Sequence, residues 1–254
     1  MLIKCPKCHG ELHKVGNTYK CLHKHSFDIA KSGYVNLLLN QSDSGDNKMM
    51  INARYEILKA GHFSQLANLL IDLINKYDIK SLLDAGCGEG YYSRSIFEAL
   101  KIDVIGIDIS KVACQKASKL CPEIPYIVSS LYDIPLFNHS VDAILNVFAP
   151  TDENEFTRIT KKYLIKVIPT EYHLYELKKR LYDDVIINEP KIPTFNNLKL
   201  IDEQDLVYQE KVLNLLDLIK MTPYYYKSAF NDEEFLNQSL VTTFAVKILI
   251  YQKE

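Results

Sequence analysis

The sequence predicts an α/β protein with a mainly parallel sheet and a small metal-binding section ahead of it. Two observations support this fold class. Short apolar runs alternate with amphipathic stretches over residues 81–147, as in βαβ units. Four candidate metal ligands gather within residues 5–25. We therefore divide the chain into a metal-binding section at 1–39, a linker with helices at 40–79 and the sheet domain at 80–254.

Turn residues organise the first part of the chain. Gly16-Asn17 separates the runs Glu11–Val15 and Thr18–Leu22 and predicts a short hairpin. This hairpin would bring the two halves of the metal site together. The polar stretch Asn40–Asn47 predicts a linker or a mobile loop.

Apolar periodicity predicts the remaining elements. Helices are expected at residues 49–60, 63–77, 91–100, 110–120 and 213–220. Strands are expected at residues 81–83, 104–107, 126–128, 143–147, 206–212 and 241–251. In the last strand, Phe244, Val246, Ile248 and Ile250 alternate with other residues, which predicts an antiparallel strand that closes the sheet.

Composition restricts the partners. The chain has 254 residues, 47% of them hydrophobic, and a formal net charge of −2, so it can build a core but has no overall attraction for nucleic acid. Local charge is different. Residues 1–31 hold six lysines and two acidic residues, and residues 158–180 hold seven basic and two acidic residues. Each segment is either an anion-binding patch or an ordinary solvated surface.

The cysteines and apolar runs indicate the cytosol. Met1–Cys5 lacks the apolar core of a signal peptide, and no apolar run approaches the roughly 20 residues that span a membrane. Three of the six cysteines fit a metal pattern and three are scattered, which is not a disulfide framework. We expect a cytoplasmic protein without a membrane partner.

Cys5, Cys8, Cys21 and His25 have the spacing of a structural zinc site. Three thiolates and one imidazole complete a tetrahedron and leave the metal no open position for chemistry. The alternative is a hairpin with fortuitous cysteines. His23 competes with His25, but it follows Cys21 by only two residues. We expect a zinc ion that stiffens a lysine-rich hairpin, which docks a large anion.

A glycine-rich loop follows the strand that ends at Asp84. Gly86, Gly88 and Gly90 let the backbone approach a ligand, but their spacing differs from the dinucleotide fingerprint. Asp84 suits a cationic amino-acid moiety, as in S-adenosylmethionine (SAM). Asp108, after the next strand, is placed to accept both ribose hydroxyls. The pattern predicts a SAM site, with a structural turn as the alternative.

Further candidates follow the later strands. Ser129-Ser130 either faces adenine or forms a plain turn. Asn146–Pro150 ends a strand where the methyl acceptor sits in such folds, and it departs from the Asn-Pro-Pro-aromatic motif of enzymes that methylate exocyclic amines. Phe148 and Tyr224-Tyr225-Tyr226 are candidates to stack on a base, with ordinary packing as the alternative for the tyrosines.

The motifs also form a combination along nearly the whole chain. They are Cys5-Pro6-x-Cys8, Cys21-x3-His25-x-Phe27-Asp28, Gly33-Tyr34-Val35-Asn36, Ala60-Gly61-His62, Asp84-x-Gly86-Cys87-Gly88-Glu89-Gly90-Tyr91-Tyr92 and Met221-Thr222-Pro223. This combination resembles the bacterial 23S rRNA (guanine-N1)-methyltransferases of the large-subunit methyltransferase A type. The resemblance implies a Rossmann-like class I SAM-dependent methyltransferase domain, a zinc domain that recognises RNA, methylation of one guanine in an rRNA hairpin loop, and a homodimer.

The resemblance also assigns residues. It places cofactor contacts at Gly90, Tyr91 and His173. Phe63 stands at an aromatic position usually filled by tyrosine, so a hydroxyl is missing there. Thr160–Tyr163 replaces the usual Lys-Pro-Gly-Gly turn, which predicts a shortened loop.

The implied reaction requires alignment of the methyl donor with the acceptor and removal of a proton from the acceptor. Methyl transfer from a sulfonium is an in-line displacement, and guanine N1 must lose its proton, with which a general base assists. Asp133, Asp152 and His62 are candidates by location, although capping is the alternative for both aspartates. Two other functions stay open: a SAM enzyme acting on a small molecule or protein with a purely structural zinc, and a non-catalytic zinc RNA-binding protein.

Overall fold

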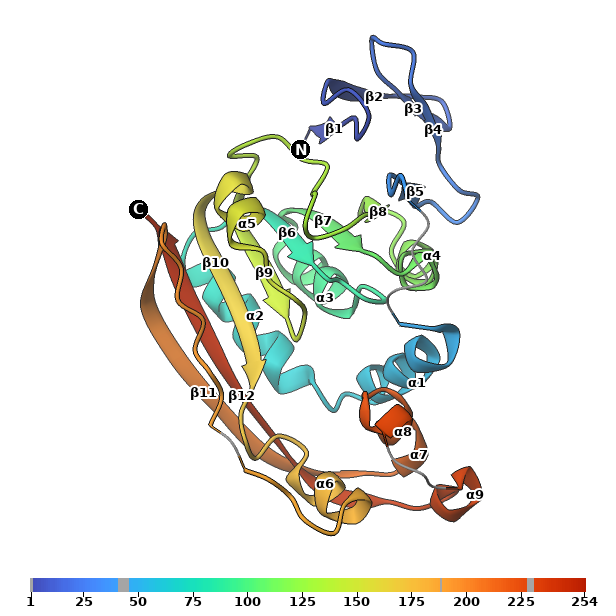
Figure 1. The fold of residues 1–254 in the computed structure, drawn as a ribbon, viewed down its shortest axis with the longest axis vertical. Helices are drawn as coiled ribbons and strands as arrows, with labels where there is room; N and C mark the ends of the chain where they lie inside the picture. The colour runs from blue at the N-terminus through green and yellow to red at the C-terminus, as the bar shows by residue number, and fades with distance from the viewer. Residues whose placement is uncertain (1, 41–45, 188, 228–230) are drawn as a thin grey trace.

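An eight-stranded sheet forms the centre of the protein, with the strand order β11-β12-β10-β9-β6-β7-β8-β5 (Figure 1). The computed structural model describes residues 2–40, 46–187, 189–227 and 231–254. The strands of this sheet are β5 (Val35–Asn36), β6 (Ser81–Ala85), β7 (Asp103–Asp108), β8 (Tyr126–Val128), β9 (Val141–Val147), β10 (Thr160–Pro169), β11 (Leu198–Val212) and β12 (Leu240–Lys253). The predicted α/β class is confirmed.

The centre of the sheet is parallel and one side is antiparallel. β6 pairs in parallel with β7 and β9, and β9 pairs in parallel with β10. β12 lies between β10 and β11 and runs antiparallel to both, which confirms the predicted antiparallel strand, although β11 rather than β12 forms the edge of the sheet. β11 begins at Leu198 rather than at the expected Leu206, because its side chains alternate between exposed and half-buried positions and form no continuous apolar run.

Helices connect the strands, and several of them start at polar caps. They are α1 (Lys48–Lys59), α2 (Ser64–Lys76), α3 (Tyr91–Leu100), α4 (Lys111–Leu120), α5 (Glu153–Ile159), α6 (Tyr175–Leu181), α7 (Leu215–Lys220), α8 (Tyr224–Lys227) and α9 (Asp232–Phe235). The side chains of Asn47, Ser110 and Asp152 each accept a hydrogen bond from a free N–H at a helix start. The five expected helices are confirmed. The others are short and carry little periodicity.

Within the described part of the chain, no helix has the length and apolar character needed to cross a bilayer.

Side chains alternate between the two faces of the sheet and build two cores. Leu82 and Val104 lie in the first core, together with residues of α2, α3 and α4. Leu83 and Ile105 lie in the second core, together with residues of α5 and with Ile3. The metal-binding section therefore contributes to the core on one face of the sheet.

The metal-binding section folds as a four-stranded antiparallel ribbon. Its strands are β1 (Ile3–Lys4), β2 (Glu11–Val15), β3 (Thr18–Lys20) and β4 (Ser26–Asp28). Gly16 has a φ of +61°, and the predicted hairpin at Gly16-Asn17 is confirmed. The backbone N–H of Lys4 donates to the carbonyl of Pro135 at 2.8 Å, which joins the ribbon to the sheet domain.

Two junctions differ from the expected organisation. Val35–Asn36, which the division at residue 39 assigns to the metal-binding section, pairs in parallel with β8 in the large sheet. A two-residue strand is too short to show a period. β10 starts at Thr160 directly after α5 ends at Ile159, so the residues of the expected short loop begin a strand, with a bulge before Tyr163. Of the predicted linker, residues 41–45 lie outside the described residues.

Candidate active site and metal centre

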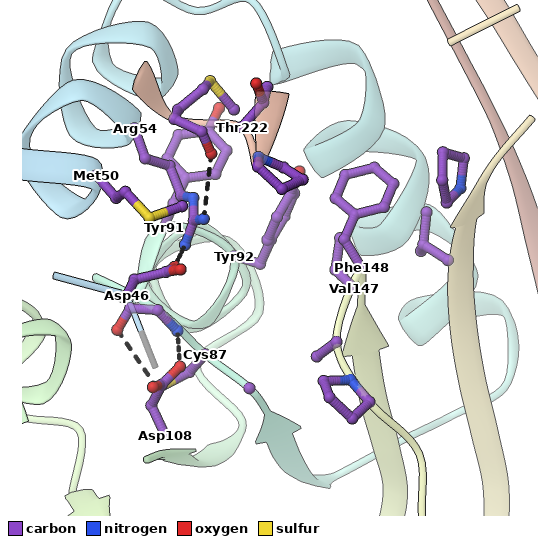
Figure 2. A pocket seen from close by; sticks show the side chains of 18 of the residues that line it. Asp46, Met50, Arg54, Cys87, Tyr91, Tyr92, Asp108, Val147, Phe148 and Thr222 are labelled. Atoms are coloured by element: carbon purple, nitrogen blue, oxygen red, sulfur yellow. Dashed lines mark hydrogen bonds and ion pairs between the residues drawn. The ribbon is translucent and has the colours of Figure 1, made fainter. Parts of the chain in front are cut away.

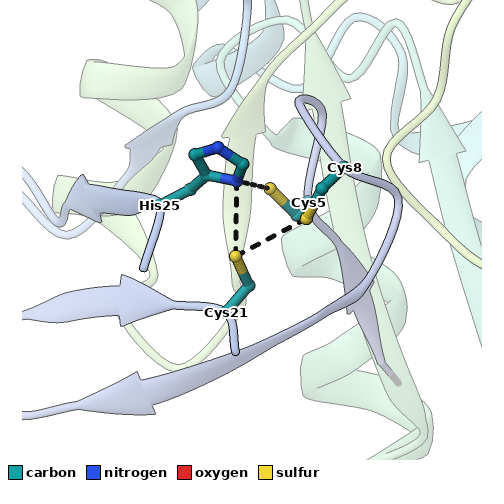
Figure 3. Close-up of side chains that lie close together, drawn as sticks. All are labelled: Cys5, Cys8, Cys21 and His25. Atoms are coloured by element: carbon teal, nitrogen blue, oxygen red, sulfur yellow. Dashed lines mark hydrogen bonds between the residues drawn. The ribbon is translucent and has the colours of Figure 1, made fainter. Parts of the chain in front are cut away.

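The four predicted metal ligands, Cys5, Cys8, Cys21 and His25, converge at one end of the ribbon (Figure 3). Their ligand atoms all lie within 4.8 Å of one another. The Sγ atoms of Cys8 and Cys21 are 3.6 Å apart, and Nδ1 of His25 lies 3.5 Å from the Sγ atoms of Cys5 and Cys21. These separations suit a tetrahedron with Zn–S bonds of about 2.3 Å. The donor set fits zinc, and His23 is exposed and outside the cluster.

Two tight turns bring these ligands together. The N–H of His9 donates to the carbonyl of Cys5 at 2.8 Å, and the N–H of Lys24 donates to the carbonyl of Cys21 at 3.0 Å. His9 and Lys24 have φ values of +59° and +63°, in the left-handed region. Each turn curls the backbone around the metal position, so the spacing in the sequence becomes one compact set of donors.

A cavity of about 910 Å³ opens between the carboxyl ends of the parallel strands and helix α1. Figure 2 shows Asp46 and Arg54 on one side of it and Phe148 on the other. Its volume lies in the range of small-molecule and cofactor sites. The predicted site residues that line it are Phe63, Gly86, Gly88, Tyr91, Asp108, Ser130, Phe148, His173 and Tyr224.

Close packing explains two glycines of the loop. A Cβ atom on Gly86 would lie 2.4 Å from the Cβ of Ala149, and a Cβ atom on Gly90 would lie 2.5 Å from the Tyr126 hydroxyl. Both glycines have positive φ values, +85° and +78°. Gly86 is part of the cavity wall, whereas Gly90 stands at the start of α3, outside the wall. The structure thus gives Gly90 a packing role.

Asp84 lies near the end of β6, ahead of the glycine loop, and is not part of the cavity wall. It is 1% exposed, and it accepts a hydrogen bond from the Ser93 hydroxyl at 2.5 Å. Burial raises the pKa of this carboxyl group to about 7. Asp84 therefore does not line the cavity itself, and its contact with a cationic moiety stays a prediction.

Two carboxylates, those of Glu89 and Asp108, line the cavity beside the glycine loop. Asp108 accepts hydrogen bonds from the N–H groups of Gly88 at 2.9 Å and Ser110 at 2.7 Å. Glu89 is 1% exposed, and its Oε1 has no hydrogen-bond partner among the described residues. Burial raises the pKa of both carboxyl groups. A buried carboxylate oxygen without a partner is costly, and a cationic ligand group would compensate it, so this wall fits the methionine end of SAM.

Arg54 closes the cavity from the side of α1. Its guanidinium forms an ion pair with Asp46, and its Nη2 donates to the carbonyl of Met221 at 3.5 Å. The bond to Met221 connects α1 to the segment that precedes α8, whereas the ion pair with Asp46 holds the residues just before α1. The sequence does not predict a role for Arg54, because a single arginine in an amphipathic helix is usually part of the solvated face.

Three rings meet at the other end of the cavity. The centroids of Phe63 and His173 lie 6.3 Å apart, and those of Phe148 and His173 lie 5.5 Å apart. Phe63 is 2% exposed, whereas Phe148 is 42% exposed. Phe148 also has a φ of +54°, an uncommon conformation for a bulky residue. The backbone thus holds one aromatic ring at the cavity where it is open to a ligand.

His173 is held as a neutral imidazole. Its Nδ1 accepts a hydrogen bond from the N–H of Ala245 at 3.2 Å, so the proton of the neutral ring resides on Nε2. Burial lowers the pKa of His173 to about 4. At neutral pH the residue contributes an N–H donor and an aromatic face, and carries no charge.

The side-chain amide of Asn146 forms its hydrogen bonds within the protein. Its Nδ2 donates to the carbonyls of Ala85 at 2.9 Å and Pro150 at 3.0 Å, and its Oδ1 accepts from Lys166 at 2.7 Å. Both amide protons are therefore used. This agrees with the departure of Asn146–Pro150 from the Asn-Pro-Pro-aromatic motif.

The three candidates for a general base lie outside the cavity wall. Nδ1 of His62 lies 2.8 Å from Oε2 of Glu210, on the neighbouring strand β11. Asp152 caps α5, which confirms the capping alternative. Asp133 lies in the loop after β8, where its carbonyl accepts from Ser129 at 3.2 Å.

The tyrosine run divides between two environments. Tyr224 lines the cavity. Tyr226 is 55% exposed, and its hydroxyl accepts a hydrogen bond from Asn47. The ring of Tyr225 packs edge-on against Tyr226, with centroids 5.2 Å apart. Tyr225 and Tyr226 thus contact each other, and Tyr224 is the residue of the run that lines the cavity.

The two basic segments also differ. Lys7, Lys14 and Lys20 of the ribbon are exposed, so their charge faces solvent. In residues 158–180, Lys166 is buried, and Arg158 forms an ion pair with Glu155. The second segment therefore does not form one continuous basic surface.

Two family models match this chain. Residues 3–43 match the zinc-ribbon model described as "RlmA, N-terminal". Residues 82–164 match the model described as "Methyltransferase domain". The two matches correspond to the ribbon and to the part of the sheet that carries the glycine loop.

Three curated proteins are similar over most of the chain. "Putative 23S rRNA (guanine-N(1)-)-methyltransferase YxjB" of Bacillus subtilis (strain 168) is 30% identical, over 72% of this chain and 70% of that protein. "Putative 23S rRNA (guanine-N(1)-)-methyltransferase" of Micromonospora griseorubida is 32% identical, over 70% and 69%. "23S rRNA (guanine(748)-N(1))-methyltransferase" of Streptomyces fradiae is 31% identical, over 69% and 66%.

Proposed function

Because the chain belongs to the family of 23S rRNA (guanine-N1)-methyltransferases, we propose that it methylates N1 of a guanine in a hairpin loop of 23S rRNA. The protein is a methyltransferase whose cofactors are SAM and a structural zinc ion. The observation that carries the proposal is the cavity. Asp108 and Glu89 suit the ribose and the cationic end of SAM, and Phe148 at the opposite end suits a flat base.

The chain acts mainly by alignment. Bound SAM supplies a methyl group on a positively charged sulfur. Gly86 and Gly88 admit the cofactor close to the backbone of the loop. Phe148 is exposed enough to stack on a base that has left its own stack. A displacement in line requires donor and acceptor to meet in one geometry, which these elements hold.

The proton on guanine N1 must leave for the methyl group to bind there. Among the described residues, the acids that line the cavity are Asp46, Glu89 and Asp108. They lie beside the glycine loop and α1, whereas Phe148 stands at the opposite end. His173 offers only its Nε2–H, because Nδ1 already accepts from Ala245. We therefore assign no general base to this chain. The residues around Phe148 contribute by positioning the acceptor base.

The ribbon is the proposed RNA-binding part. Its four metal ligands are all protein atoms, so the zinc stabilises the fold and takes no part in the transfer. Its exposed lysines supply the contacts to phosphate that a chain of net charge −2 otherwise lacks. We further propose that the enzyme acts in the cytoplasm as a homodimer, in which two ribbons border one RNA cleft.

Methyl transfer to 23S rRNA that lacks the modification tests the proposal. The purified protein and labelled SAM should label this RNA, and primer extension should stop at one guanine, because a methyl group on N1 blocks the pairing edge. Label in RNA without a stop would contradict the N1 assignment. Label in no RNA, but in a small molecule or protein, would favour the alternative substrate class.

A further inference from the structure

Lys166 is a buried lysine in the cavity wall that the proposed function does not use. It lies on β10, opposite Asn146 on the parallel strand β9, and is 6% exposed. Its Nζ donates to Oδ1 of Asn146 at 2.7 Å, to Oγ1 of Thr151 at 2.5 Å and to the carbonyl of Ala149 at 3.3 Å. An ammonium group has three N–H donors, and these contacts use all of them.

The charge of Lys166 is unusual because its partners are neutral oxygens. No carboxylate among the described residues lies within ion-pair distance of its Nζ. Burial lowers the pKa of Lys166 to about 8. A buried cation without a counter-ion is costly, so a purely structural position would be filled more cheaply by an apolar side chain.

All three acceptors belong to one loop segment, Asn146–Thr151, whose first two residues end β9, and they lie on both sides of Phe148. The same loop contacts the cofactor side, because Ala149 packs where a Cβ atom on Gly86 would be. Phe148 keeps its left-handed conformation although it is not glycine. Such a conformation persists only where the surroundings determine it. The contacts of Lys166 and the bond from the Phe148 N–H to the carbonyl of Val167, at 3.1 Å, supply that determination.

We propose that Lys166 is a positioning residue, which fixes the Asn146–Thr151 loop so that the Phe148 ring holds the acceptor base against the methyl donor. This inference rests on the proposed function, since it assigns Phe148 to the acceptor base. Lys166 itself acts on the loop and does not touch the base, because its donors are occupied. We call the hydrogen bonds from Lys166 to the Asn146–Thr151 loop the clamp. Loss of the clamp should therefore lower the turnover of methyl transfer and leave cofactor binding intact.

Steady-state kinetics with Lys166→Met provide the first test. This variant keeps the apolar stem and removes the donors. We expect kcat for methyl transfer to 23S rRNA to fall about 10²-fold, the effect of a misplacement near 1 Å, while the Kd of SAM stays unchanged by calorimetry. Lys247→Met is the matched control, since Lys247 pairs with Asp205 outside the cavity. An unchanged kcat, or a parallel loss of SAM affinity, would overturn the proposal.

Two additions make the test independent of folding and of activity. If Lys166→Met does not fold, Thr151→Val removes one acceptor at similar volume and should lower kcat in the same way. The chain has no tryptophan, so Phe148→Trp introduces a single indole reporter. Adding Lys166→Met should lower its anisotropy and increase its quenching by acrylamide, and adding Lys247→Met should not. An equally ordered indole without Lys166 would contradict the clamp even if rRNA proved not to be the substrate.

Discussion

The carboxylate of Asp108 accepts a hydrogen bond from the backbone N–H of Gly88, and so joins the end of β7 to the glycine loop. Its other oxygen accepts from Ser110, which caps α4. One side chain therefore fixes the loop after one strand and the helix after the next. This arrangement sets the shape of the cofactor end of the cavity before any ligand arrives.

Asp108→Asn should weaken SAM binding. The amide keeps one acceptor but places an NH2 group against a backbone N–H, which shifts the loop. We expect the Kd to rise by about 10-fold or more, since a hydrogen bond to a charged group is worth roughly 1.5–3 kcal/mol. Calorimetry measures the change. Asp103→Asn, at the exposed start of the same strand, is the control, and equal affinity in both variants would contradict this role.

Removal of zinc should separate RNA binding from cofactor binding. Cys8→Ser should release the metal and disorder the ribbon, because no other donor in the described structure completes the tetrahedron. We expect transfer to 23S rRNA to be lost while SAM affinity is retained. Metal analysis checks the loss of zinc, filter binding checks the loss of RNA binding, and calorimetry checks the affinity for SAM. Cys121→Ser, away from the metal, should change none of them, and a collapse of SAM binding in Cys8→Ser would refute the separation of the two parts.

Gly90→Ala should destabilise the fold. The new methyl group would lie 2.5 Å from the Tyr126 hydroxyl, at a residue with a φ of +78°. We expect the free energy of unfolding to fall by about 2–4 kcal/mol, from overpacking and from the left-handed backbone together. Urea denaturation measures the loss. Gly16→Ala, with φ +61° and open space around it, should cost only about 1 kcal/mol. Adding Tyr126→Phe should recover part of the loss at Gly90, and no recovery would assign it to the backbone alone.

Stability should depend on pH through Asp84 and His173, with opposite signs. Burial raises the pKa of Asp84 to about 7, so the folded state binds this proton more tightly than the unfolded chain. The contribution of this proton to the free energy of unfolding is therefore lost as pH rises from about 4 to 7. Burial lowers the pKa of His173 to about 4, so its contribution is complete above about 6.5 and is lost as pH falls toward 4. The two slopes oppose each other over most of this range.

Asp84→Asn isolates one of these slopes. Relative to the unmodified protein, the stability of the variant should rise with pH between 4 and 7, by up to about 1.4 kcal/mol per pH unit. Denaturation in a series of buffers measures this difference. Ser93→Ala, which removes the hydrogen-bond partner but keeps the carboxyl group, should retain the pH dependence. A difference between Asp84→Asn and the unmodified protein that does not change with pH would contradict the raised pKa.

The sequence predicts the strands and helices that have a strong period, and it predicts the zinc ligands because their spacing alone brings them together. Its periodicity predicts neither β5 nor the true start of β11, and it also leaves out β10 (Thr160–Pro169). β5 has only two residues, and β11 is an edge strand whose side chains, apart from the buried Leu198 and Val212 at its ends, are exposed or half-buried. In both cases pairing with a neighbouring strand decides the structure, and pairing leaves little trace in local composition.

The site shows the same limit. Asp108 is the last residue of β7, and its place at the carboxyl edge of the sheet is predictable from the sequence. Lys166 and Arg54 reach the cavity from the interior of a strand and of a helix, and only the register of β9 with β10 and the position of α1 bring them there. Asp84 was assigned to the ligand by its motif, whereas its burial next to Ser93 depends on how α3 packs over the loop.

The pairing of β5 with β8 has a consequence for how an RNA would be selected. The chain that leaves the ribbon enters the same sheet whose strand ends form the cavity, so strand pairing attaches the ribbon to the part of the protein that carries the cavity. A ribbon on a loose tether would accept many RNA shapes. Under the proposed function, a ribbon attached in this way selects a guanine by its distance from the phosphates that the lysines contact. It does not read the bases between them.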